Sequence, residues 1–189
     1  LNTVDLCPVG ALIGKDFLYQ ARVWFLEKSE TICPSCSRGC NITVSSIKGN
    51  IKRLEPRLNM EINQYWMCDD GRLNYKYVNS DRRLTKVKGA ASSEEAVRAI
   101  HTAIGKYGPG RVAMVISTWQ TLEEMYLLRK LAERHRIGAV GVITLERGER
   151  KTFKSGFAIA ADKTPNRRGA ELIFGNGPTL GDMGKVAEG

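Results

Sequence analysis

Four cysteines at fixed spacing constrain this chain more than any other feature of its sequence. Cys33, Cys36 and Cys40 fall within eight residues, and Cys68 follows after 27 intervening residues. Thiols this close in sequence rarely pair with one another in good disulfide geometry, but they can converge on one metal centre. A 4Fe–4S cluster needs four thiolates, one for each iron. We therefore expect these four residues to hold such a cluster, and we expect Gly39 to permit a bend before the third ligand.

Structural zinc is the alternative for the same four residues. Zinc sites of this kind usually pair two C-x2-C knuckles, whereas Cys68 has no second cysteine or histidine near it in the sequence. The spacing thus favours an iron–sulfur cluster over a zinc-binding structural module. Tyr65 and Trp66 lie just before Cys68, and we expect them either to shield the cluster from water or to be plain core residues.

The fifth cysteine, Cys7, lies apart from this motif and is followed by Pro8. A Cys-Pro pair commonly ends the cluster motif of a ferredoxin, but no cysteines precede Cys7 in this sequence. Two interpretations stay open: a buried free thiol, or the last ligand of a second cluster whose other ligands lie outside this chain. The sequence has neither an initiator Met nor a signal peptide pattern, so it reads as cut from something longer or matured by processing.

Composition and charge exclude several classes of protein. The 189 residues are 42% hydrophobic and 26% charged, which is typical of one ordinary globular domain or two small ones. No stretch approaches the roughly 18 apolar residues of a transmembrane helix. The net charge of +9 is spread evenly and forms no stripe with interleaved aromatic residues, so we expect acidic protein neighbours and no nucleic acid. No nucleophile–base pair is found, and we therefore expect no catalytic residues.

The hydrophobic pattern predicts a small β unit followed by alternating helices and strands. Residues 41–55 suit a hairpin around Gly49-Asn50. Later, Ser92 and Thr121 each begin a capping-box pattern for a helix. Apolar strands are expected at 111–117 and 139–144. The order helix, strand, helix, strand predicts a right-handed parallel β-α-β unit and an α/β fold class. We expect the Gly-rich residues 175–184 to form a loop and not a nucleotide site.

Three stretches of the sequence resemble known proteins. Residues 2–12 resemble the end of the second ferredoxin-like module in the large iron–sulfur subunit (the G subunit) of NADH-quinone oxidoreductase, respiratory complex I. The four-cysteine motif, ending in residues 68–72, resembles the iron–sulfur domain at the head of molybdopterin oxidoreductases. Residues 162–170 are similar to a stretch in the middle of the same large iron–sulfur subunit.

This resemblance implies a domain organisation and a role. Residues 1–24 would be the tail of a ferredoxin-like 4Fe–4S module and a linker. Residues 25–88 would be a small β-rich 4Fe–4S domain of the molybdopterin-oxidoreductase type, and residues 89–189 an incomplete parallel α/β domain. The implied role is that of an oxidoreductase subunit without a self-contained active site, relaying electrons from NADH-reduced flavin toward quinone. The implied partners are the other hydrophilic-arm subunits, including the flavin subunit, at the cytoplasmic side of the bacterial inner membrane, peripherally and without direct membrane insertion.

The resemblance also implies two sets of ligands. Cys33, Cys36, Cys40 and Cys68 would bind the off-path 4Fe–4S cluster that some bacterial versions contain, and Cys7 would supply the fourth thiolate of an upstream cluster. Molybdenum-containing relatives generally place a Lys two residues after the last cysteine, where this chain has Asp70. An acid there repels the anionic pterin phosphates and cannot donate as Lys does, so we expect no molybdopterin. The alternative is that the chain is the front segment of a formate-dehydrogenase-like molybdoenzyme, and Asp70 argues against it.

Overall fold

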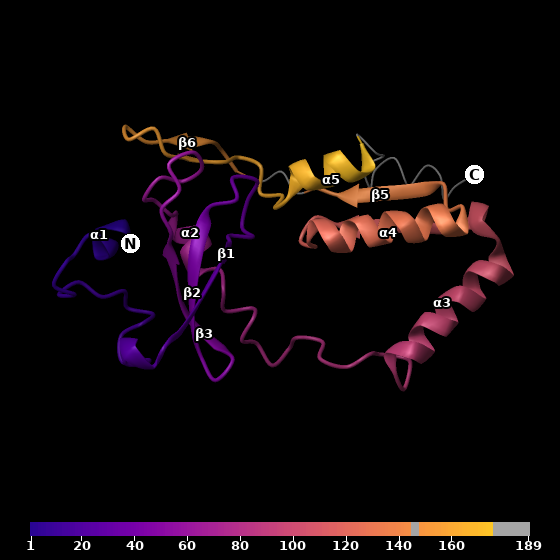
Figure 1. Ribbon diagram of the computed structural model, residues 1–189, viewed down its shortest axis with the longest axis horizontal. Coiled ribbons are helices and arrows are strands. Elements are labelled where there is room, and N and C mark those ends of the chain that lie inside the picture. The colour runs from indigo at the N-terminus through magenta and orange to yellow at the C-terminus, as the bar shows by residue number, and fades with distance from the viewer. Residues whose placement is uncertain (145–147, 176–189) are drawn as a thin grey trace. The chain divides into compact units, whose positions relative to one another are not determined.

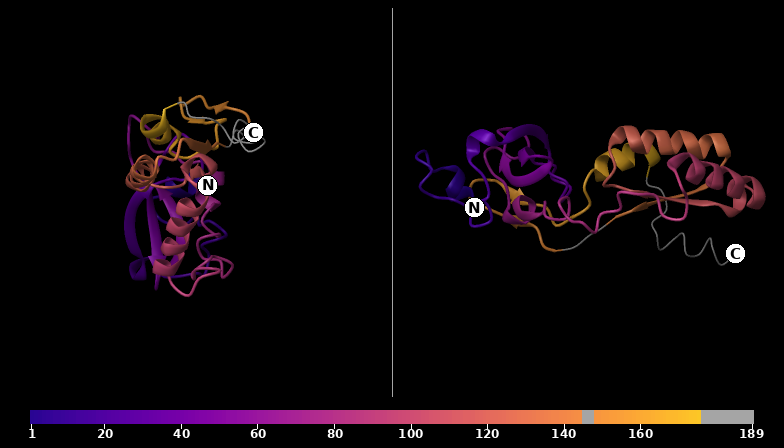
Figure 2. Two further views of the ribbon diagram at one scale, coloured as in Figure 1. Left: turned by 90° about the vertical axis from the view of Figure 1, so that its right-hand side faces the viewer. Right: turned by 90° about the horizontal axis from the view of Figure 1, so that it is seen from below.

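The computed structural model describes residues 1–144 and 148–175 and shows a mixture of helices, antiparallel strands and parallel strands (Figures 1 and 2). The chain divides into two compact units, and each is made from two separate stretches of sequence. The first unit consists of Leu1–Arg83 and Glu146–Pro165, and the second of Leu84–Leu145 and Asn166–Gly189. These ranges are not those of the predicted domains, because residues 148–165 pack with the cysteine-rich part of the chain.

The first unit is built on a three-stranded antiparallel sheet in the order β1-β2-β3 (Figure 1). Its strands are β1 (Glu27–Ile32), β2 (Asn41–Ile47) and β3 (Asn50–Pro56). Strands β2 and β3 form the predicted hairpin. Lys48 and Gly49 connect them with φ angles of 49° and 77°, both in the left-handed region. Two successive residues with positive φ match the twist of a tight hairpin, which places Asn50 in the strand and not in the turn.

The core of the first unit contains cysteines as well as large apolar side chains. Its buried members are Cys33, Cys40, Ile42, Leu54, Met67, Tyr75 and Phe157. Trp66 packs against this core, whereas Tyr65 is 56% exposed. Only Trp66 of this pair is thus placed to keep water from the cysteines.

Short helices complete the first unit around this sheet. They are α1 (Asn2–Asp5), the 3-10 helix η1 (Val23–Phe25) and α2 (Asp69–Leu73). Helix α2 begins directly after Cys68, and the sulfur of Cys68 accepts a hydrogen bond from the backbone N–H of Gly71 at 3.3 Å. A two-stranded hairpin of β6 (Lys151–Thr152) and β7 (Ala158–Ile159) also belongs to this unit.

The second unit contains the predicted parallel β-α-β order. Its elements are α3 (Ser93–Tyr107), the 3-10 helix η2 (Pro109–Arg111), β4 (Ala113–Ser117), α4 (Leu122–His135), β5 (Ala139–Ile143) and α5 (Arg167–Phe174). Strands β4 and β5 pair in parallel, with Met114 opposite Val140. No helix in the described part of the chain combines the length and the apolar composition needed to cross a membrane.

The predicted helix starts are found, with one difference in detail. The capping box of α4 is complete, because Thr121 accepts from the N–H of Glu124 at 3.2 Å and Glu124 accepts from that of Thr121 at 2.9 Å. At α3, Ser92 accepts from the N–H of Glu95, but the Glu95 carboxylate accepts from Ala91, one residue before the cap.

Helix α5 was not predicted from the sequence. It packs against α4, and Ala170 is buried in a core with Ile116 and Met125. A Cβ on Gly169 would come within 2.6 Å of the side chain of Leu122, so the two helices approach closely at this glycine. Of the predicted loop at 175–184, all but Gly175 lies outside the described residues.

Candidate iron–sulfur site

The four cysteines of the sequence motif lie together in the first unit and form one site, which we call the four-cysteine site. Cys33, Cys36 and Cys40 are only 5%, 7% and 5% exposed, and Cys68 is half-buried. The backbone N–H of Cys33 donates to the carbonyl of Cys40 at 2.8 Å, which closes the loop that carries the first three thiols. Gly39 adopts a φ of +64° just before Cys40, the bend expected there.

Helix α2 closes the site from a second segment of the chain. A Cβ on Gly71 would lie 3.0 Å from the sulfur of Cys33 and 3.4 Å from that of Cys68. The glycine therefore lets the helix backbone come close to two sulfurs that are far apart in the sequence. Its N–H is the donor to Cys68, and hydrogen bonds of this kind tune the potential of a cluster held by the sulfurs.

Burial makes these thiols costly to ionise without a metal. Burial raises the pKa of the Cys33 and Cys68 thiols. It raises the pKa of Cys40 to about 12, and the charges of Cys33, Cys36 and Cys68 push it in the same direction. The four groups thus lie close enough to repel one another as thiolates. Cations relieve this repulsion, and metal binding deprotonates cysteine ligands, so the donor set fits a group with a positively charged iron core.

The described residues contain no group of three or more His, Cys, Asp or Glu side chains that converges tightly enough to hold a single metal ion. A cubane cluster does not require that convergence. Each of its thiolates binds a different iron, whereas all ligands of a tetrahedral zinc lie at about 2.0–2.3 Å from one ion.

An open cavity of about 480 Å³ lies beside the four-cysteine site, and we call it the mouth cavity. Its lining residues are Ser35, Cys36, Cys68, Asp69, Asp70, Leu73, Asn74 and Lys163. Lys163 comes from a segment more than 90 residues after the last cysteine of the motif. It was not among the predicted site residues, because no local pattern indicates that this segment returns to the cysteines.

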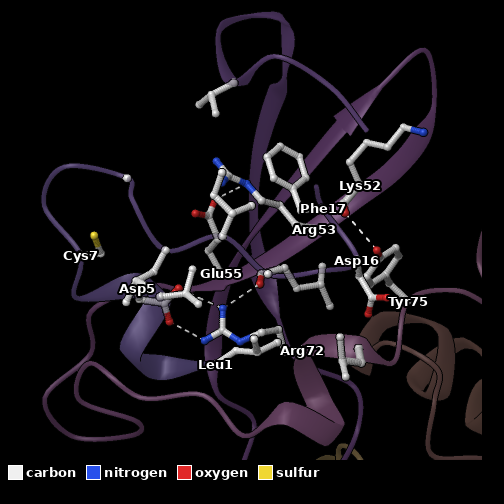
Figure 3. Close-up of a pocket in the computed structure, with 18 residues that line it drawn as sticks. Leu1, Asp5, Cys7, Asp16, Phe17, Lys52, Arg53, Glu55, Arg72 and Tyr75 are labelled. Carbon is white, nitrogen blue, oxygen red and sulfur yellow. Dashed lines mark hydrogen bonds and ion pairs between the residues drawn. The ribbon is translucent and has the colours of Figure 1, made fainter. Parts of the chain in front are cut away.

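Cys7 lies outside the four-cysteine site. It lines a different cavity of about 320 Å³, between the N-terminal segment and β3, and Figure 3 shows it on the loop at the edge of that cavity. The Cys7 thiol is free and half-buried. A hydrogen bond from the backbone N–H of Leu12 lowers its pKa.

The opposite pKa shifts predict which thiol of the metal-free chain reacts first. Thiolates are the nucleophiles, so lowering a pKa increases the reactive fraction at neutral pH. We expect iodoacetamide at pH 7 to modify Cys7 first and Cys40 last, because the pKa of Cys40 is about 12. Raising the pH toward that value should accelerate the modification of Cys40 more than that of Cys7. Peptide mass spectrometry measures the order in which the two cysteines are modified. The Cys7→Ser chain is the control and should lose the fast phase of modification. Equal rates at Cys7 and Cys40 would contradict the prediction.

Comparison with known proteins shows which proteins these features resemble. Residues 26–80 match the molybdopterin oxidoreductase Fe4S4 domain. The chain is 32% identical over 139 residues to the G subunit of NADH-quinone oxidoreductase from Rickettsia conorii, which covers 70% of the chain and 21% of that relative. It is 33% identical over 138 residues to NADH-quinone oxidoreductase subunit 3 of Thermus thermophilus, covering 70% of the chain and 18% of the relative.

A third relative, the G subunit of NADH-quinone oxidoreductase from Pseudomonas fluorescens, is 30% identical over 177 residues, which covers 90% of the chain and 19% of the relative. The chain thus spans between 18% and 21% of the length of these three proteins. The resemblance expected from the sequence is confirmed. Residues 26–80 match the molybdopterin oxidoreductase Fe4S4 domain, and the chain is similar to the G subunits of NADH-quinone oxidoreductases over 70–90% of its length.

Proposed function

We propose that this chain is part of the iron–sulfur subunit of an NADH-quinone oxidoreductase and relays electrons from NADH-reduced flavin toward quinone. The observation that carries the proposal is the four-cysteine site, in which buried thiols from two segments meet inside residues 26–80. The relatives named for this oxidoreductase support the same role.

In this proposal Cys33, Cys36, Cys40 and Cys68 hold a 4Fe–4S cluster. When bound, the cluster supplies reversible one-electron exchange. The protein contributes position and insulation: Ile42, Leu54 and Met67 are at most 4% exposed and keep water from the buried side of the site. We assign no acid–base chemistry and no catalytic residue to this chain.

We also propose that Cys7 is the fourth ligand of a second 4Fe–4S cluster, with the other three thiolates supplied from outside residues 1–189. A half-buried thiol with a lowered pKa ionises readily, as a metal ligand must. Its place at a separate cavity fits a second cluster better than the first.

The types of the two domains are part of the same proposal. The part of the first unit within residues 25–88 corresponds to a small β-rich cluster domain, and the parallel strands β4 and β5 of the second unit to the beginning of a parallel α/β domain of the molybdopterin-oxidoreductase type. Asp69 and Asp70 line the mouth cavity, where two acids repel the phosphates of a pterin cofactor, and this supports a chain without molybdopterin. The partners would be other hydrophilic-arm subunits, including the flavin subunit, on the cytoplasmic side of the bacterial inner membrane.

Metal analysis of anaerobically prepared protein tests the proposal. We expect about four irons and about four acid-labile sulfides per chain at the four-cysteine site. One zinc without sulfide would favour the structural zinc module instead. Molybdenum or pterin in a longer form of the protein would favour the front segment of a formate-dehydrogenase-like enzyme.

A further inference from the structure

The segment 148–165 forms a second wall of the four-cysteine site. Its hairpin places Phe157 in the same core as Cys33 and Cys40, where Phe157 is 4% exposed. The backbone N–H of Phe153 donates to the carbonyl of Phe157 at 2.9 Å and fixes the turn between them. In Figure 1 this hairpin, labelled at β6, lies over the end of the first unit that carries α2.

Two contacts fasten this segment to the loop that carries the first three cysteines. The backbone N–H of Ser37 donates to the carbonyl of Asp162 at 3.1 Å. The guanidinium of Arg38 lies 4.8 Å from the centre of the Phe157 ring, within the range of a cation–π contact. Because Ser37 and Arg38 lie between Cys36 and Cys40, the segment is held by the loop that carries the thiols.

The same contacts set the position of Lys163. The carboxylate of Asp162 accepts from the N–H of Thr164 at 2.9 Å, a bond that spans Lys163, and Thr164 is fully buried. A Cβ on Gly148 would lie 3.7 Å from the Cε of Lys163, so the lysine stem passes close to a residue without a side chain. Lys163 then lines the mouth cavity together with Cys36 and Cys68.

The described residues that line the mouth cavity include more acidic than basic side chains. Of its described lining residues, Lys163 is the one with a positive charge, while Asp69 and Asp70 are acidic. Reduction adds one negative charge to a group already held by thiolates. A nearby positive charge stabilises the reduced form more than the oxidised form, and partial burial strengthens the effect.

We propose that the positive charge of Lys163 raises the reduction potential of the cluster at the four-cysteine site. The negative charge of Asp70 acts in the opposite direction and lowers that potential. The inference rests on the proposed function, since it requires the cluster to be present. It assigns a role to the 148–165 segment: this segment adds a cation at the open side of the site, where the mouth cavity is otherwise lined by acids, whereas Arg38 is the cation within the cysteine motif itself.

A redox titration of the anaerobically assembled chain, followed by low-temperature electron paramagnetic resonance, tests the proposal. We expect the midpoint potential to fall in Lys163→Gln, to stay close to that of the parent in Lys163→Arg, and to rise in Asp70→Asn. Lys154→Gln is the matched control, because Lys154 is exposed and lies in the same segment outside the mouth cavity. It removes the same charge and should leave the potential unchanged.

The outcomes separate the two proposals. An unchanged potential in Lys163→Gln with a full complement of iron would overturn the role of Lys163 and leave the proposed function standing. An equal fall in Lys163→Gln and Lys163→Arg would also overturn it, because the effect would then be one of packing and not of charge. A parent chain that binds no iron would instead contradict the proposed function.

Discussion

The Cys36→Ser chain is expected to bind less than about one iron, where the parent binds about four. Cys36 is 7% exposed and lines the mouth cavity, so the substitution removes one thiolate from the open side of the site. Soft thiolate ligands select iron–sulfur clusters, and a serine hydroxyl is a much poorer ligand at neutral pH. The loss of one of four ligands leaves one iron without its protein ligand, and the cluster becomes labile. Iron and sulfide analysis, with the low-temperature magnetic-resonance signal of the reduced sample, measures the loss.

Cys7→Ser is the matched control for this experiment. It makes the same chemical change at a cysteine that lines a different cavity, so the iron held at the four-cysteine site should stay near that of the parent. Far-ultraviolet circular dichroism checks that both variants keep their secondary structure. Retention of about four irons by the Cys36→Ser chain would remove Cys36 from the ligand set.

Local signals in the sequence were sufficient to predict the elements next to each motif. The hairpin of β2 and β3 follows from short apolar runs around Lys48-Gly49-Asn50, but the turn lies one residue earlier than expected and the register shifts between Ser45 and Ser46. The capping box at Thr121 and Glu124 starts α4 as predicted. These features depend on residues within a few positions of one another, and the sequence pattern contains that information directly.

Contacts between distant segments were not predictable in the same way. The bond between Ser37 and Asp162 joins residues 125 positions apart, and no pattern in either segment indicates the other. Helix α5 was missed for a similar reason, since its eight residues include Gly169 and its burial depends on α4. A glycine lowers helix propensity, and tertiary packing overrides that preference here. The cysteine ligands could thus be proposed from the sequence, but the wall that carries Lys163 could not.

Arg72→Leu is expected to lower the free energy of unfolding of the first unit by about 2 kcal/mol, because it removes the charged hydrogen bonds that the buried guanidinium makes to the partly buried Asp5 carboxylate and to the backbone. The guanidinium of Arg72, 7% exposed, is paired with the carboxylate of Asp5 and donates to the carbonyl of Leu54 at 3.2 Å (Figure 3). In the variant, the Asp5 carboxylate and the Leu54 carbonyl both lose the guanidinium as hydrogen-bond donor, and the leucine side chain has no donor to replace it. Urea titration of the metal-free chain measures the change, with Arg82→Leu as the control because Arg82 is exposed.

A double-mutant cycle then separates the ion pair from the rest of the arginine's contacts. Asp5→Asn alone should destabilise the first unit, and Arg72→Leu should cost less in the Asp5→Asn background than in the parent, because the stranded charge is already gone. This coupling matters for the cluster as well as for stability. Arg72 belongs to α2, the helix whose Gly71 approaches the sulfurs of Cys33 and Cys68, so the ion pair ties that helix to the N-terminal segment. We therefore expect Arg72→Leu also to slow cluster assembly, and full stability with additive effects in the cycle would contradict the assigned role of the pair.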